Sequence, residues 1–273
     1  MSTNPTLAAS PSNTETRFNL YGPVHKGLPA FPGDTLMRLG QMDAGDDTSV
    51  KAALDQLDAL LDYCESHLQK EDDYVHPAIE SQRPGFSERI AGEHAEHAHA
   101  ILALRAAADA MACSAGSERM AAGTAPYRRF AGFVAENLTH MEIEESRHND
   151  ILWSCFDDAA LAAINERILA ATSMADLALG ARWIVPHLSP AERSAVLAGA
   201  RATMPAAAFD GMIDMLLPHL SAEQSQQLAV DFGMAGTRPT SSAREIVERF
   251  LDAAFVRFDV EEAGALGRAG FVA

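Results

Sequence analysis

The sequence predicts an all-α protein, an antiparallel four-helix bundle followed by a smaller helical C-terminal region. Alanine is abundant and aromatic residues make up only 7% of the 273 residues, a balance that favours helices over sheets. Apolar residues recur at spacings of three and four in the long segments between about residues 18 and 156. The connections between these segments are short, which favours antiparallel neighbours.

Composition divides the chain into four parts. Residues 1–17 are rich in Ser, Thr, Pro and Asn, so we expect this N-terminus to be disordered. Residues 18–156 hold the predicted bundle, and residues 157–232 form an all-α extension of short helices. Residues 233–273 contain a Gly-Thr-Arg-Pro-Thr linker and a terminal amphipathic helix, AREIVERFLDAAF.

The first two bundle segments differ in clarity. Around His25, the prolines Pro29 and Pro32 predict a short turn and a break, followed by helix through TLMRLG. The second helix is expected from about Thr48 to Val75, because its apolar residues step by four and three and Pro77 follows it.

The last two bundle helices are predicted from their apolar stripes. The third runs from Glu88 to about Cys113, and the fourth from about Pro126 to Phe156. The intervening GSERMAAGTAP is expected to be a loop or a frayed helix end. In the extension, the phrases WIVPHLSPAER and MLLPHLSAEQ each predict a helix end at Pro-His-Leu and a serine cap, with Ser189 and Glu192 forming a capping box.

One arrangement of histidine and glutamate occurs twice within the predicted bundle. A histidine is followed 42 or 43 residues later by a second histidine, and a glutamate lies four residues beyond that one. The copies are related by offsets of 72, 73 and 73 residues. The six residues are His25, His67 and Glu71 in the first copy, and His97, His140 and Glu144 in the second.

The spacing places each glutamate on the same helix face as its histidine, because residues four apart stack. HxxxE occurs four times, but His76/Glu80 is interrupted by Pro77, and His219/Glu223 spans a helix end. Only the two copies related by the repeat, His67/Glu71 and His140/Glu144, lie inside predicted helices.

These residue types predict a dinuclear metal site. Neutral imidazoles are terminal ligands for iron, and a glutamate can bridge two metals with its two oxygens. Two glutamates on core stripes would each cost several kcal/mol if they were neither neutralised nor bound to metal. The alternative, buried His–Glu pairs without metal, does not explain the repeat.

Other histidines complicate the ligand set. His94 lies one turn before His97, so either residue can be the third-helix ligand. The repeat spacing favours His97. In that case His94 is a fifth ligand or an outer hydrogen-bond partner of a ligand. His148 lies one turn after Glu144 and is a further possible ligand. His76 is interpreted as structural or as a pocket residue, and His99 as solvent-exposed.

The phrases YGPVHKGL, ESHLQKEDDYVHPAIE, GEHAEHAHAILALR and ENLTHMEIEESRHNDILW resemble the haemerythrin-like, or HHE, domain family over about residues 18–156. The resemblance implies two iron ions per chain, with terminal ligands His25, His67, His97 (or His94) and His140, and with Glu71 and Glu144 bridging. The sequence is closer to bacterial members with four histidines and two glutamates than to the five-histidine oxygen carriers. This resemblance implies a non-haem di-iron protein that binds or reacts with O2, NO or peroxide, in sensing or detoxification.

Two other functions stay open at this point: iron storage or delivery, and a metal-gated protein-interaction module. No P-loop, GxGxxG or nucleophile–base pair is present, so any reaction would take place at the metal. The net charge of −17 argues against nucleic acid and anionic membranes as partners. Three unpaired cysteines and the lack of a signal-peptide pattern predict a cytoplasmic protein, and the sequence leaves the oligomeric state open.

Overall fold

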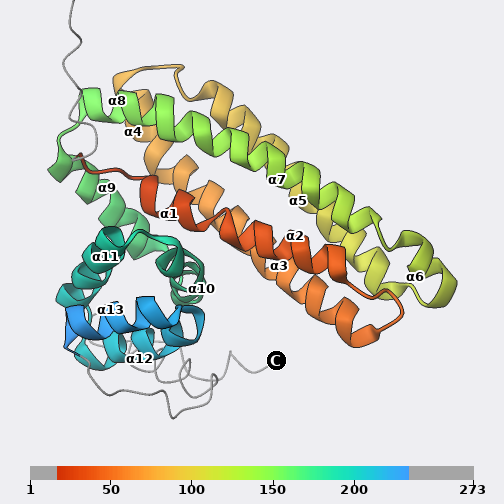
Figure 1. Ribbon diagram of the computed structural model, residues 1–273. Coiled ribbons are helices and arrows are strands. Elements are labelled where there is room, and N and C mark those ends of the chain that lie inside the picture. The colour runs from red at the N-terminus through yellow and green to blue at the C-terminus, as the bar shows by residue number, and fades with distance from the viewer. Residues whose placement is uncertain (1–16, 234–273) are drawn as a thin grey trace, which may run out of the picture.

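The computed structural model describes residues 17–233, and every regular element among them is a helix (Figure 1). The long helices of the N-terminal half lie side by side as a bundle, as the sequence predicts. They are α2 (Ala30–Gln41), α3 (Asp47–Lys70), α5 (Glu88–Cys113) and α7 (Ala125–Ile143). The predicted N-terminal disorder and the terminal helix AREIVERFLDAAF lie outside the described residues, apart from Arg17.

Helix α3 shows why these segments are helical and how they pack. The side chain of Asp46 caps its first turn by accepting a hydrogen bond from the backbone N–H of Thr48. Its apolar stripe is buried along the whole length, and Leu57, Leu60 and Leu61 are fully enclosed. Burial of this stripe against α2 and α5 supplies most of the stability of such a helix.

Two π-helical turns interrupt the predicted helices just after the HxxxE motifs. The turn η2 (Glu71–Val75) leads into α4 (His76–Gln82), and η3 (Glu144–His148) leads into α8 (Asn149–Cys155). The N–H of His76 bonds to the carbonyl of Glu71, five residues back, and that of Asn149 bonds to Glu144 in the same way. The expectation of continuous α-helix to Val75 and Phe156 was therefore wrong in detail: π turns carry the chain onward, and the second helix runs on past His76.

The N-terminal segment breaks where the prolines predict a break. His25 lies in the short helix α1 (Gly22–Gly27), and Pro29 precedes α2. Pro32 is in the first turn of α2, where a missing N–H costs no intrahelical bond. The expected loop GSERMAAGTAP instead contains the short helix α6 (Gly116–Ala122), none of whose residues is buried.

The C-terminal helices form a smaller unit beside the bundle, joined to it through α9 (Asp158–Ala171) (Figure 1). It contains α10 (Met174–Ile184), η4 (Val185–His187), α11 (Pro190–Thr203), α12 (Ala206–Leu216), η5 (Leu217–His219) and α13 (Ala222–Phe232). Both Pro-His-Leu phrases end helices, and the capping box of Ser189 with Glu192 is present, as predicted. Ser221 and Gln224 form a second one.

The smaller unit packs directly on α1 and α2. Phe31 of α2 stacks on Trp183 of α10 with ring centroids 4.4 Å apart. Lys26 of α1 forms an ion pair with Glu192 of α11, and Gly27 lies against Ile184. The short helix that carries His25 is therefore held between the bundle and the C-terminal unit.

Within residues 17–233 no single helix is long and apolar enough to cross a bilayer. The pair α9 and α10 passes the same test of length and composition only when taken together, and it is bent by 118°.

Candidate metal centre

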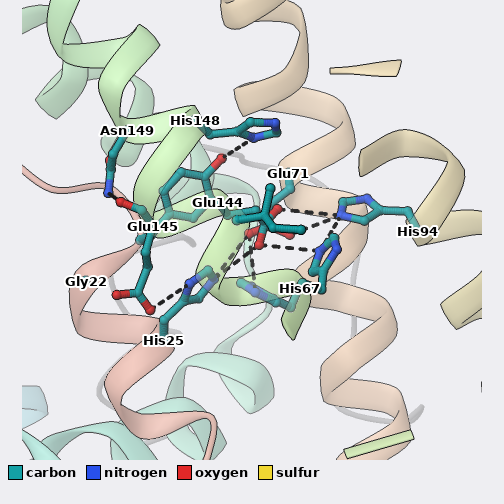
Figure 2. Close-up of polar contacts among 12 residues, drawn as sticks. Gly22, His25, His67, Glu71, His94, Glu144, Glu145, His148 and Asn149 are labelled. Atoms are coloured by element: carbon teal, nitrogen blue, oxygen red, sulfur yellow. Dashed lines mark hydrogen bonds and ion pairs between the residues drawn. The ribbon is translucent and has the colours of Figure 1, made fainter. Parts of the chain in front are cut away.

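Six side chains, each from a different element, converge inside the bundle (Figure 2). Buried apolar residues lie on both sides of this polar cluster along the chain. The buried stripe of α3 is apolar as far as Leu68, apart from His67 itself, and apolar packing begins again at Val75. The six residues are His25 from α1, His67 from α3, Glu71 from η2, His94 from α5, His140 from α7 and Glu144 from η3.

The six residues form two adjoining groups that share Glu71. Donor atoms of Glu71, His94, His140 and Glu144 all lie within 4.8 Å of one another, and so do those of His25, His67 and Glu71. All of these residues are buried except His67, whose side chain is 17% exposed. Each group offers imidazole nitrogen and carboxylate oxygen to one enclosed point, as a metal ion requires.

Each glutamate faces both groups with its two oxygens. Oε1 of Glu71 lies 3.3 Å from His67 Nε2 and 3.6 Å from His25 Nε2, while its Oε2 lies 3.6 Å from His94 Nε2.

Glu144 is placed in a related way. Its Oε2 lies 3.4 Å from His140 Nε2 and 3.7 Å from His25 Nε2, and its Oε1 lies 3.7 Å from His94 Nε2. This is the arrangement that two bridging carboxylates would have.

The donor set fits a pair of cations. All four oxygens of Glu71 and Glu144 are buried without a hydrogen-bond partner, and so is Nε2 of His25. In addition, Nε2 of His94 lies 3.1 Å from Nε2 of His140. Because Nδ1 of each ring faces a carboxylate, both Nε2 atoms are lone pairs when the rings are neutral, and neither can donate a hydrogen bond to the other. Buried acceptors without donors are costly, and a bound metal satisfies all of them together.

The two glutamates also shape the electrostatics of the cluster. Burial lowers the pKa of His25, but the carboxylates of Glu145, Glu71 and Glu144 outweigh it and raise the pKa to about 9. His94 behaves alike: burial opposes its protonation, yet Glu144, Glu71 and Asp72 raise its pKa to about 9. The site therefore favours positive charge strongly, whether as protons or as metal ions.

Three outer carboxylates contact the ring nitrogens that point away from the centre. Nδ1 of His94 lies 2.8 Å from Asp72, Nδ1 of His140 lies 3.1 Å from Glu93, and Nδ1 of His25 lies 3.3 Å from Glu145. This leaves Nε2 as the inward lone pair, because an imidazole that ligates a metal usually donates its other N–H to a carboxylate or carbonyl. Our sequence reasoning missed these three residues, although the adjacent pairs Glu71-Asp72, Glu93-His94 and Glu144-Glu145 were a usable signal.

His97, favoured by the repeat spacing, occupies a different place from His94. It is buried, and its ring lies edge-on to that of His140 with centroids 4.8 Å apart. However, it belongs to neither group of converging donor atoms. Burial and then the neighbouring His140 and His94 lower the pKa of His97 to about 4, so it is a neutral ring beside the cluster.

The remaining histidines separate into two kinds. His148 is buried with Nδ1 3.1 Å from the Tyr21 hydroxyl, and together with His76 and Glu144 it forms a further group of converging donors. His99 is exposed as predicted, and His187 contacts the carbonyl of Trp183 at its helix end.

A helical bundle with buried His/Glu clusters of this geometry defines a class of cation-binding proteins. Residues 34–148 match the family described as "Hemerythrin HHE cation binding domain", so the chain carries a haemerythrin HHE domain over that segment. The family resemblance of the sequence is thereby confirmed, and the buried clusters are consistent with a di-metal site. Comparisons with curated proteins and with solved structures found no match.

Proposed function

We propose that this protein binds two iron ions and that the centre binds or reacts with O2, NO or peroxide, in sensing or detoxification. The observation that carries the proposal is the pair Glu71 and Glu144, whose four oxygens lack hydrogen-bond partners and face imidazoles on both sides. When bound, two iron ions would supply a redox-active centre for a small ligand.

For the ligand set we propose His25, His67, His94 and His140 as terminal ligands, with Glu71 and Glu144 bridging. His94 replaces His97 in this proposal for two reasons. Its Nε2 faces both glutamates, and its Nδ1 is held by Asp72. His97 would support the ring of His140 from the side.

The protein's own residues fix the ligands and limit access to them. Asp72 and Glu93 hold the imidazoles of His94 and His140 through Nδ1, and Glu145 lies 3.3 Å from Nδ1 of His25, so the inward nitrogens keep their direction. Buried apolar residues flank the ligands along the second helix, with Leu68 next to His67 and Val75 four residues after Glu71. A small diatomic molecule or peroxide fits such an enclosed centre better than a large substrate does.

Iron storage or delivery is the second candidate, and one observation favours it. The side chain of His67 is 17% exposed, and the outer carboxylates of Asp72 and Glu145 are 41% and 44% exposed. These groups give a cation a polar route between solvent and the cluster. Rapid, complete removal of iron by a mild chelator, with no reaction toward NO, O2 or peroxide, would identify this function.

The first test is metal content and an optical spectrum of protein produced in iron-replete medium. We expect about two irons per chain and near-ultraviolet charge-transfer absorption that changes on addition of azide. Glu144→Gln should lose both signals, and the exposed neighbour Glu142→Gln should keep them. Iron-free wild-type protein with a featureless spectrum would contradict the proposal.

A further inference from the structure

A second group of buried polar side chains adjoins the proposed metal pair. His76 is the first residue of α4 and His148 the last residue of η3, and both follow a glutamate of the pair along the chain. The side chain of His76 is 7% exposed, and His148 is fully buried. No sequence pattern joins the two, because Pro77 predicts that His76 stands at a helix end.

Each of the two rings has a polar contact at Nδ1. Nδ1 of His76 lies 2.9 Å from Oδ1 of Asp72, a carboxylate that can only accept, so this nitrogen carries the hydrogen. In a neutral ring Nε2 is then a lone pair, and it is buried with no hydrogen-bond partner. Nδ1 of His148 is occupied by the Tyr21 hydroxyl at 3.1 Å.

We propose that His76, His148 and Glu144 form an additional binding position for a divalent first-row metal ion, next to the pair. Their donor atoms lie within 4.8 Å of one another, and all three residues are buried. Donors on one such ion lie at about 2.0–2.2 Å from it and so no more than roughly 4.4 Å apart, so the donor atoms would move inward on binding. Two imidazoles with one carboxylate is a ligand set that suits Fe(II) and leaves open positions.

The proposed position lies among carboxylates. Five of them contact the imidazoles of the two clusters, and one of the five, Glu93, is also paired with Arg89 at 2.8 Å. The five are Glu71, Asp72, Glu93, Glu144 and Glu145. Asp72 serves both clusters, because its Oδ1 also contacts Nδ1 of His94. The proposal rests on the proposed function in one respect, since Glu144 would be shared with the pair.

The test is an anaerobic titration of the metal-free full chain with Fe(II), with bound metal counted by mass spectrometry after desalting. We expect the wild type to retain a third ion beyond the pair. His76→Gln should retain only the pair and still show its near-ultraviolet absorption on exposure to air. The exposed His99→Gln is the matched control and should behave like the wild type. Circular dichroism and the melting temperature establish that each variant is folded.

The outcomes separate this inference from the proposed function. If the wild type and His76→Gln both retain only two ions, the additional position is overturned and the di-iron centre stands. Loss of the pair's absorption in folded His76→Gln would also overturn it, because His76 would then belong to the pair itself. If the wild type binds no iron, the proposed function fails as well. His148→Gln provides an independent repeat, with the third ion bound at least about tenfold more weakly as the supporting result.

Discussion

The substitution Gly27→Ala tests whether the C-terminal unit holds His25 in place. A Cβ on Gly27 would lie 2.6 Å from Cγ1 and 2.9 Å from Cβ of Ile184, and closer still to its Cα. Carbon atoms in contact prefer about 3.5–4.0 Å, so α1 would have to move by roughly 1 Å. His25 lies two residues earlier on the same short helix and would move with it.

Such a shift should affect both stability and metal binding. Overpacking of this kind costs about 1–3 kcal/mol. Metal–ligand distances tolerate only about 0.2 Å, so we expect iron to bind at least about tenfold more weakly at the half of the centre that uses His25. Urea unfolding of the metal-free protein and competition with a chelator measure the two effects.

Gly33→Ala is the matched control, because nothing lies within 4 Å of a Cβ at that position in α2. It should be neutral or stabilising by up to about 1 kcal/mol through helix propensity, with metal binding unchanged. The reasoning is refuted if Gly27→Ala unfolds at the same urea concentration as the wild type and binds iron with the same affinity.

Three further predictions concern the metal ligands and the contact of α1 with α11. His94→Gln should lower the iron content of the purified protein, whereas His97→Gln should leave near two irons per chain; the reverse result would assign the α5 ligand to His97. Removal of metal that was present at 1,000 times its Kd should lower the free energy of unfolding by about 4 kcal/mol. Calorimetry should then show a melting temperature about 8–16 °C lower, and an unchanged melting temperature would contradict a metal site in the folded state. Hydrogen bonds from Lys26 and Ser189 lower the pKa of Glu192 to about 2, so its contribution is present above about pH 4.5 and is lost as the pH falls toward 2. This half-exposed pair is screened, so the loss should stay below about 1 kcal/mol, and Glu192→Gln should remove that part of the acid dependence of unfolding.

The bundle itself could be predicted from the sequence, because its determinants are local. Residues such as Leu57 and Leu61 recur at helical spacing, and a stripe of that kind must be buried. The motifs His67/Glu71 and His140/Glu144 could be predicted for the same reason, since residues four apart share a face of an α-helix.

The π-helical turns were not predicted, and this explains why the sequence did not place His76 beside the cluster. A hydrogen bond from residue i+5 to residue i adds a residue to the turn, and no side-chain pattern reveals it. In a regular α-helix, His76 would point well away from Glu71, five residues before it. The turn η2 brings the two onto adjoining parts of one cluster instead.

The choice between His94 and His97 depended on a contact between helices. The repeat spacing is a distance along the chain, whereas the position of His94 is set by how α5 packs against η2 and α7. Its contact partners Asp72 and His140 lie 22 and 46 residues away from it in the sequence. The docking of α10 on α1 was unpredictable for the same reason, since the sequence does not reveal which element Gly27 faces.

The packing of α1 against α10 has a consequence for the order of assembly during synthesis. His25 leaves the ribosome before any other proposed ligand, yet Ile184 and Glu192, which hold its helix, are made some 160 residues later. The three long helices α3, α5 and α7 can associate first, since their contacts need nothing beyond residue 155. The earliest ligand is thus the last to be fixed, and a nascent chain halted before α10 would offer iron a centre with a loosely held His25.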